Sequence, residues 1–304
     1  MRSSLSLLAL SAAIAGALTV GVLALFADAA SVPANAFTAD TLNPPTAPSS
    51  TGILSTALSW TATSDTYAAG HRVLRGTVSG GPYAQVGQVT PRTTTTFTES
   101  PSPGTYYYVL RGYYQNWESV NSSQVTALVS AQTGYRDCSA NAAVTTSSGD
   151  NNGYQTNPGN ACANDAARAV DTDSGTASGT ACNSTARDRH LFYNYGFSIP
   201  AGASIRGIEV RLDALVDGTG GAPAICVEIS WNGGASWTVG KITPTLTTAE
   251  ATYTLGANTD TWGRTWATTE FTNANFRIRT ITIASSTARD YQLDWIPVQV
   301  TYTP

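Results

Sequence analysis

Short segments in which apolar and polar residues alternate, separated by turns, make up most of the sequence after residue 50. Segments such as ALSWTAT, GHRVLRG and YAQVGQV follow one another at short, regular intervals. A period of two places every second side chain on one face of a strand, whereas a helix requires apolar residues every three or four positions. The sequence therefore predicts an all-β protein in which only the N-terminus forms an apolar helix.

The first 43 residues differ from the rest of the chain. An uncharged run extends from Leu5 to Phe26 and is long enough to span a bilayer. Alanine occupies three of the next four positions, as a signal-peptidase site requires. We therefore expect residues 1–30 to be a signal peptide or membrane anchor, and residues 31–43 to be an extended segment of the mature protein.

Two motifs in this region resemble the start of camelysins and biofilm-matrix fibre proteins. FAD at 26–28 and NAFTADTL at 35–42 correspond to that family's motifs, with Asp40 in place of the usual glycine. The resemblance implies export through a dedicated signal peptidase and a place on the cell surface or in the extracellular matrix. A fibre subunit is one alternative function, because residues 29–42, once freed, would add as a strand to the sheet edge of the next subunit.

Residues 44–130 carry the marks of a first folded module. The proline-rich stretch NPPTAPSS at 43–50 predicts an extended linker. LSW ending at Trp60, then HRVLR, then TYYYVLRGY with Tyr106 as the corner tyrosine, resemble a fibronectin type III domain, although His71 stands where that family more often has tyrosine. The resemblance implies a two-sheet sandwich that acts as a spacer or adhesive module, with Trp60 on its second strand.

The segment at 104–114 also predicts which side chains face the core of this module. Tyr106, Tyr108 and Leu110 share one face of a strand, which we expect to point inward. The remaining aromatic residues are interpreted as an exposed sheet face or a module interface rather than a ligand site; they are Tyr107, Tyr113, Tyr114 and Trp117.

Residues 131–304 contain longer predicted strands. In IRGIEVRLDALV, Ile208, Val210 and Leu212 alternate with charged residues, as in a strand buried on one face. NPGNACANDAARA, YGFSIPAGASIRGIEVRL, TDTWGRTW and YQLDWIPVQVTYT resemble, in this order, a jelly-roll module of bacterial exported proteins and phage tail-associated proteins. The resemblance implies a larger jelly-roll β-sandwich and no defined activity.

All four cysteines lie in this second module. In an exported chain without a C-x-x-C pair, they are expected to form disulfides rather than to bind a metal. Three pairings are open, and we prefer Cys162–Cys182 with Cys138–Cys226. The first of these bridges would remove about 3 kcal/mol of conformational entropy from the unfolded chain.

The stretch EISWNGGASWT at 228–238 matches the Asp-box pattern S-x-D-x-G-x-[ST]-W, with asparagine in place of aspartate. The matching residues are Ser230, Asn232, Gly234, Ser236 and Trp237. In the families that carry it, this motif is a folding device, and Asn-Gly is itself a strong hairpin signal. We interpret the stretch as a structural hairpin with Trp231 turned toward the core. A platform for sugar is the alternative.

The sequence offers one candidate for an exposed aromatic ligand site. In DTWGRTW, Trp262 and Trp266 are four residues apart, with Arg264 between them. In an extended segment these three side chains share one side and would form a ladder of alternating indole and guanidinium groups.

Acidic residues in turns raise the question of a metal. Asp171 and Asp173 begin like an EF-hand loop, but the later ligand positions are occupied by Gly175 and Cys182, which excludes that motif. Asp165 joins them as a candidate ligand of a structural calcium outside an EF-hand. Asp294, if buried in the last strands, requires a hydrogen-bond partner and is assigned a structural role.

Several classes of function lack the residues that they need. The net charge is −4 and no stretch gathers Lys or Arg, so nucleic acid is not an expected partner. The sequence has two histidines and contains no nucleophile elbow, H-E-x-x-H motif or phosphate-binding loop, so we expect no enzyme.

The predicted function is a non-catalytic extracellular protein that acts in adhesion or surface structure. Its expected partners are components of the cell surface or matrix, polysaccharide included, and self-assembly is the fibre alternative. A carbohydrate-binding accessory protein is the other alternative. The membrane would be contacted only through an uncleaved N-terminal segment, and no cofactor is expected apart from a structural calcium.

Overall fold

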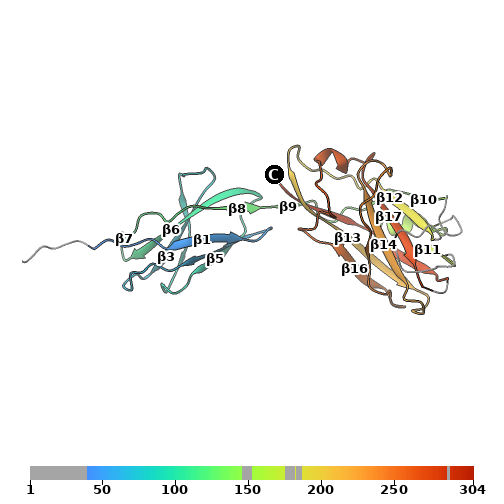
Figure 1. Ribbon diagram of the computed structural model, residues 1–304, viewed down its shortest axis with the longest axis horizontal. Coiled ribbons are helices and arrows are strands. Elements are labelled where there is room, and N and C mark those ends of the chain that lie inside the picture. Colours follow the sequence, from blue (N-terminus) through green and yellow to red (C-terminus); the bar gives the residue numbers. More distant parts are fainter. Residues whose placement is uncertain (1–39, 146–152, 175–181, 183–186, 286–287) are drawn as a thin grey trace, which may run out of the picture. The chain divides into compact units, whose positions relative to one another are not determined.

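The structure, a computed structural model, describes residues 40–145, 153–174, 182, 187–285 and 288–304. Within these residues the chain forms β-strands and two short 3-10 helices, η1 (Pro158–Ala161) and η2 (Thr268–Phe271), which confirms the all-β prediction (Figure 1). No helix in the described part of the chain is long and apolar enough to cross a membrane. The predicted signal or anchor at 1–30 and residues 29–39 of the predicted donor strand lie outside the described residues.

Strands β1 to β8 form two sheets, here called the first sandwich. One sheet has the order β1-β2-β5, with bounds Thr46–Thr51, Thr56–Thr61 and Thr96–Glu99. The other has the order β4-β3-β6-β7, with β8 beside β6; the bounds are Ala84–Val89, Gly70–Gly76, Gly104–Tyr114, Trp117–Glu118 and Val125–Val129. The neighbouring strands are antiparallel. The predicted alternating segments coincide with these strands, and the fold is a fibronectin III-like sandwich.

Strand β1 corrects the predicted linker. Residues 46–51 pair with β2, so they are not a free polyproline-like stretch. Pro48 is tolerated because β1 lies at the edge of its sheet, where a missing N–H breaks no ladder. The register shifts between Thr46 and Ser49, and Ala47 there has a φ of 49°, as in a bulge.

The core of the first sandwich agrees with the predicted faces. Trp60 of β2 packs with Tyr108 and Leu110 of β6 in one buried cluster, and Tyr106 packs against its rim. The Tyr106 hydroxyl donates to the Ser102 carbonyl at 2.7 Å, which is the contact of a corner tyrosine. His71 is buried because its Nδ1 accepts the Trp60 indole N–H at 3.0 Å. This departure from the family pattern therefore has a structural role in the core.

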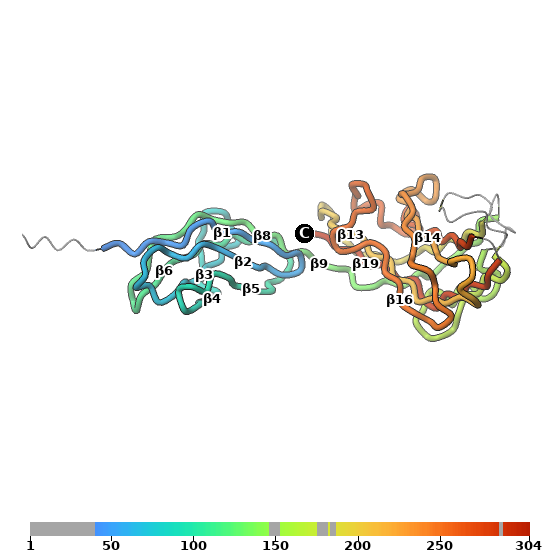
Figure 2. Tube along the Cα trace, turned by 60° about the horizontal axis from the view of Figure 1, so that its bottom comes forward, coloured from blue at the N-terminus to red at the C-terminus, as the bar shows by residue number. Residues whose placement is uncertain are grey.

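Strands β9 to β19 form the second sandwich, again from two antiparallel sheets. One sheet has the order β10-β12-β17-β14-β15, with bounds Ala140–Ala143, Arg189–Tyr193, Arg277–Ile283, Ala224–Ser230 and Lys241–Ile242. The other has the order β11-β18-β13-β19-β9, with bounds Ala169–Asp171, Tyr291–Trp295, Ser204–Val216, Val298–Thr303 and Ala131–Gln132. Strand β16 (Ala251–Gly256) pairs with β13, which Figure 2 shows beside β19.

The two faces of β14 are buried for different reasons. Ile225, Val227 and Ile229 point into the core between the sheets, as alternation predicts. Cys226 lies on the opposite face, in a smaller buried cluster with Ala224, Ile281, Ile283 and Cys182. This second cluster covers part of the outer face, where Glu228 pairs with Arg279, and every residue of β14 is buried.

This division between the two faces corrects the preferred disulfide pairing. The bridges are Cys138–Cys162, with Cα atoms 4.9 Å apart, and Cys182–Cys226, with Cα atoms 5.6 Å apart. Cys138 belongs to the inner core, whereas Cys226 points out of the other face of β14, so these two sulfurs cannot meet. The preferred pairs Cys162–Cys182 and Cys138–Cys226 are therefore wrong.

Candidate ligand-binding groove

The turn between β14 and β15 is built from the Asp-box residues. The Ser230 hydroxyl accepts the Gly234 N–H at 2.8 Å, and the Asn232 Oδ1 accepts the Ser236 N–H at 2.8 Å. The Asn232 amide also donates to the Ser236 hydroxyl at 3.1 Å. Gly234 has a φ of 102°, a conformation that side chains disfavour. The motif therefore satisfies the polar groups of a tight turn and sets the direction of the chain that follows it.

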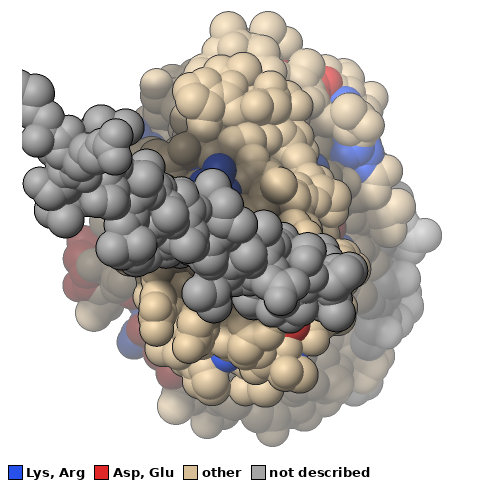
Figure 3. Space-filling view, turned by 90° about the vertical axis from the view of Figure 1, so that its left-hand side faces the viewer, with Lys and Arg blue, Asp and Glu red and all other residues tan. Residues whose placement is uncertain are grey.

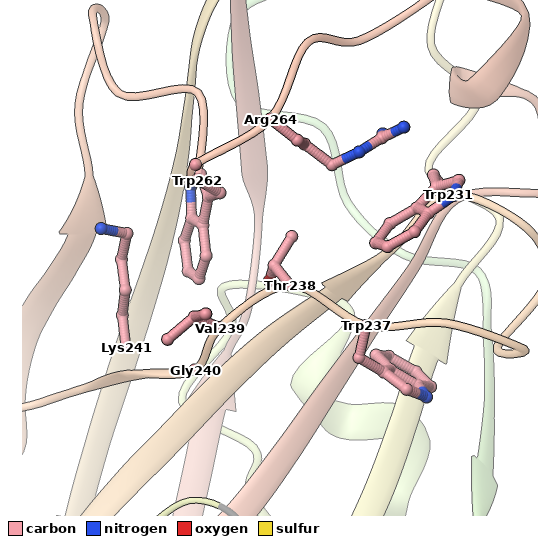
Figure 4. Close-up of a pocket in the computed structure, with 9 residues that line it drawn as sticks. Trp231, Trp237, Thr238, Val239, Gly240, Lys241, Trp262 and Arg264 are labelled. Carbon is pink, nitrogen blue, oxygen red and sulfur yellow. The ribbon is translucent and has the colours of Figure 1, made fainter.

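Beyond this turn the chain borders a groove of about 580 Å³ (Figure 4). The lining residues come from the hairpin and from the loop after β16; they are Trp231, Trp237, Thr238, Val239, Gly240, Lys241, Trp262, Gly263 and Arg264. Lys241 and the Trp262 ring lie on one side, the Trp231 and Trp237 rings on the other, and Thr238 between them. Its volume is within the range of about 300–1,000 Å³ that is usual for ligand sites.

Gly240 explains the position of the chain that forms one wall of the groove. A Cβ at this position would lie 2.7 Å from the sulfurs of both Cys182 and Cys226, so only glycine fits against the disulfide. The bridge thereby positions the chain between Val239 and Lys241.

The structure contains a stack of indole and guanidinium groups, but Trp231 takes the predicted place of Trp262 in it. The Arg264 guanidinium lies 4.1 Å from the ring centroid of Trp231 and 4.3 Å from that of Trp266. Glu270 binds the same guanidinium through both carboxylate oxygens, at 3.0 and 2.8 Å. Trp231, which was predicted to turn toward the core, packs against it while also lining the groove.

The sequence predicted that Trp262 and Trp266, with Arg264 between them, are exposed. For the two tryptophans this prediction is wrong. Trp262 is 4% exposed and Trp266 5%, and both belong to the core. The prediction assumed an extended segment, but Trp262 lies in a turn with a φ of 55°. Its backbone N–H donates to the Asp260 carboxylate at 2.8 Å and its indole N–H to the Ile208 carbonyl at 2.9 Å, and these bonds fix that turn.

Each cation of the groove is held by a carboxylate. The Lys241 ammonium lies 5.1 Å from the Trp262 ring centroid and 2.8 Å from the Asp260 carboxylate. Burial acts to raise the pKa of Asp260, but the hydrogen bonds from Lys241 and from the Trp262 N–H outweigh it and lower that pKa. In the same way, burial opposes but does not prevent a lowered pKa of Glu270, because Arg264 and the Ala267 N–H bind its charged form. Both carboxylates are therefore ionised at neutral pH.

The groove offers indole surface, one hydroxyl and two cations. Its nine lining residues include no carboxylate. Aromatic faces beside hydrogen-bonding groups are suited to hold a ligand that has both an apolar face and polar edges.

Sequence reasoning missed Lys241 and Thr238. Lys241 is the only lysine in the sequence and comes four residues after Trp237, which is the one signal that marks it. Thr238 was hidden because its role depends on pairing: its hydroxyl accepts the Ile229 N–H at 3.0 Å across the hairpin.

The carboxylates proposed for calcium do not converge. The Asp171 Oδ2 accepts the Thr282 hydroxyl in a buried position, and the Asp165 Oδ1 accepts the Ala167 N–H of its own turn. Asp173 contributes its backbone N–H to Asp290. Among the described residues, no group of three or more His, Cys, Asp or Glu side chains is placed to hold a metal ion.

Asp294, for which the sequence predicts a structural role if it is buried, is 1% exposed. Burial raises its pKa and the charge of Glu250 raises it further, whereas the backbone N–H groups of Asp165 and Ala166 stabilise its charged form. The carboxyl group thus ties the 165–166 turn to the sheet.

Charged residues make up 12% of the sequence. On the face shown in Figure 3, Lys and Arg are scattered among uncharged atoms rather than gathered into a patch.

Comparison with known proteins gives similarities of fold. No protein-family model and no curated protein matches the chain. A Fn3-like protein from Clostridium thermocellum is 26% identical over 30% of this chain and 95% of its own, with a TM-score of 0.26. Chicken CNTN1 FN1-FN3 domains are 11% identical over 82% of this chain and 70% of their own, with a TM-score of 0.32.

A further solved structure contains the CBM22-1 and GH10 modules of the Clostridium thermocellum endo-1,4-β-D-xylanase 10B, complexed with xylohexaose. It is 13% identical over 57% of this chain, with a TM-score of 0.29. The match spans only 28% of that xylanase chain. None of these similarities assigns a function to this protein.

Proposed function

We propose that this chain is a non-catalytic extracellular protein of the cell surface or matrix that adheres to polysaccharide through the groove of its second sandwich. The observation that carries the proposal is the set of indole rings from Trp231, Trp237 and Trp262 around one groove. Sugar rings present a flat apolar face and a rim of hydroxyls, which match an indole face and neighbouring donors. The first sandwich would act as a spacer.

Two disulfides support the extracellular location, because such bridges persist in oxidising compartments. The resemblances to camelysin-type signal segments and to the jelly-roll modules of exported proteins support it too. The mature N-terminus, determined on protein from its native source, tests export: a start between Ala27 and Ser31 is expected. An intact N-terminus on protein that is absent from the cell surface and the medium would contradict it.

Binding is tested with the purified protein, whose affinity is measured for a panel of neutral and acidic plant and bacterial polysaccharides. Trp237→Ala removes a ring from the groove and is expected to weaken binding by about fivefold, since a stacked aromatic contributes on the order of 1 kcal/mol. Trp117→Ala is the matched control, because Trp117 is 44% exposed in the first sandwich. Failure to bind any member of the panel, or equal losses in both variants, would refute the proposal.

A further inference from the structure

The charge of the groove differs from that of the protein as a whole. The chain has a net charge of −4, yet the groove is lined by Lys241 and Arg264 and by no Asp or Glu. A ligand in the groove therefore meets an ammonium and a guanidinium at close range, whereas the net charge repels anions from the molecule at a distance.

The Lys241 ammonium has donors to spare for a ligand. It carries three N–H groups, of which Asp260 accepts one at 2.8 Å. Its side chain is 33% exposed, and Figure 4 shows it along the edge of the groove beside Trp262. Asp260 does not line the groove; it fixes the ammonium in place and offsets part of its charge.

Arg264 repeats this arrangement. Two of its five N–H groups bind Glu270, and the rings of Trp231 and Trp266 hold its plane at 4.1 and 4.3 Å. Glu270 likewise does not line the groove. Both cations are thus immobilised before a ligand arrives, which reduces the ordering that binding requires.

We infer that the groove selects carboxylated polysaccharide, meaning chains of uronic acid residues, over neutral polysaccharide, with Lys241 as the residue that binds the carboxylate. This inference rests on the proposed function and adds the class of ligand to it. The indole faces bind the sugar rings, and the two cations bind the carboxylates that a neutral chain lacks.

The test compares polygalacturonate oligosaccharides with the same oligosaccharides after methyl esterification, which removes the charge and keeps the sugar. Titration calorimetry at low salt is expected to give about tenfold tighter binding for the free acid, from two partly exposed ion pairs. The preference is expected to shrink at high salt, where screening shortens the reach of these charges. Lys241→Gln is expected to reduce the preference several-fold, because the free acid then loses the ammonium that binds its carboxylate.

Arg111→Gln is the matched control, since Arg111 is a partly exposed cation of the first sandwich that pairs with Glu118. It is expected to leave both affinities unchanged. Because Lys241 is the only lysine, an amine-selective acetylating reagent gives a second readout: the free acid should protect this side chain and the ester should not.

Equal affinity for acid and ester, both lost in Trp237→Ala, would overturn the inference while the proposed function stood. An acid preference that survives in Lys241→Gln would also overturn it. If neither oligosaccharide binds but a neutral member of the panel does, and does so through Trp237, the inference fails alone. If nothing on the panel binds, the proposed function fails with it.

Discussion

The two sandwiches use the same architecture but treat their outer surfaces differently. The first exposes aromatic residues, with Tyr67 at 36%, Tyr114 at 40% and Trp117 at 44%, and it contains no cysteine. The second buries both faces of β14 and fastens its loops with two disulfides. The buried cluster on the outer face of β14, which includes the Cys182–Cys226 bridge, supports the irregular segments that form the groove.

The groove illustrates this dependence on a rigid support. Its walls are loops with little regular pairing, and such segments hold a site only when a scaffold positions them. Here the Trp262 indole is fixed to the Ile208 carbonyl of β13, and Gly240 packs on the Cys182–Cys226 bridge. The first sandwich contains no cysteine and therefore has no bridge of this kind.

Removal of the Cys182–Cys226 bridge is expected to have the largest effect on the difference in stability between the two sandwiches. Its sequence separation is 44 residues. Replacing both cysteines with alanine is expected to destabilise the second sandwich by about 4 kcal/mol through the larger entropy of its unfolded chain. Urea unfolding, followed by hydrogen exchange of peptides from each sandwich, measures this. A comparable loss of stability in the first sandwich would contradict the prediction that this bridge stabilises only the second.

Acid should affect the second sandwich next most strongly, through His190. Its Nδ1 accepts the Tyr154 N–H at 3.2 Å and its Nε2 pairs with the Asn141 Oδ1 at 3.0 Å, an arrangement that fits the neutral ring. Burial lowers the pKa of His190 from 6.5 to about 4. The unfolded chain therefore takes up a proton first as the pH falls, and stability that is present above pH 6.5 is lost progressively toward pH 4.

For this residue the expected loss between pH 7 and pH 5 is about 2 kcal/mol. Urea midpoints at the two pH values measure it. His190→Asn should reduce the dependence on pH by that amount, and an unchanged pH profile in this variant would contradict the assignment.

The Asp-box turn should show a smaller effect. Asn232→Ala removes the acceptor of the Ser236 N–H, so we expect a loss of about 1–2 kcal/mol in the second sandwich. Asn232→Asp keeps that acceptor and restores the full motif, so it serves as the matched control and should stay within about 0.5 kcal/mol of the parent. Equal losses in the two variants would show that the acceptor is not what stabilises the turn.

The smallest effect is expected in the first sandwich. Tyr106→Phe removes the hydroxyl that donates to the Ser102 carbonyl, at a cost of about 1 kcal/mol. Tyr107→Phe, on the other face of the strand, should change the stability by less than about 0.5 kcal/mol. Thermal unfolding of the two variants distinguishes the corner contact from a general loss of hydroxyls.

Alternation of side chains was sufficient to predict the strands and their inner faces. It placed Tyr108 and Leu110 in one core and Ile208, Val210 and Leu212 in the other, because a strand has only two faces. It did not find β1, because Pro48 within it and the two prolines just before it are typical of a linker, and only a neighbouring strand supplies the pairing.

The candidate site was less predictable for the same reason. Trp262 and Trp266 were recognised as a pair, but their burial follows from a turn that depends on Asp260 and on a carbonyl 54 residues away. Lys241 entered the site only because the hairpin brings it beside Trp262. A pattern of neighbouring residues does not show which distant segments come into contact.

The sequence by itself determined that the chain builds sheets, which side chains turn inward and where a tight hairpin forms, since these depend on neighbours within a few residues. Only the tertiary structure decided which cysteines meet, which tryptophans are covered and where the cations of the groove lie. Those outcomes depend on which faces of distant strands come together, and a period of two along one strand carries no information about its partners.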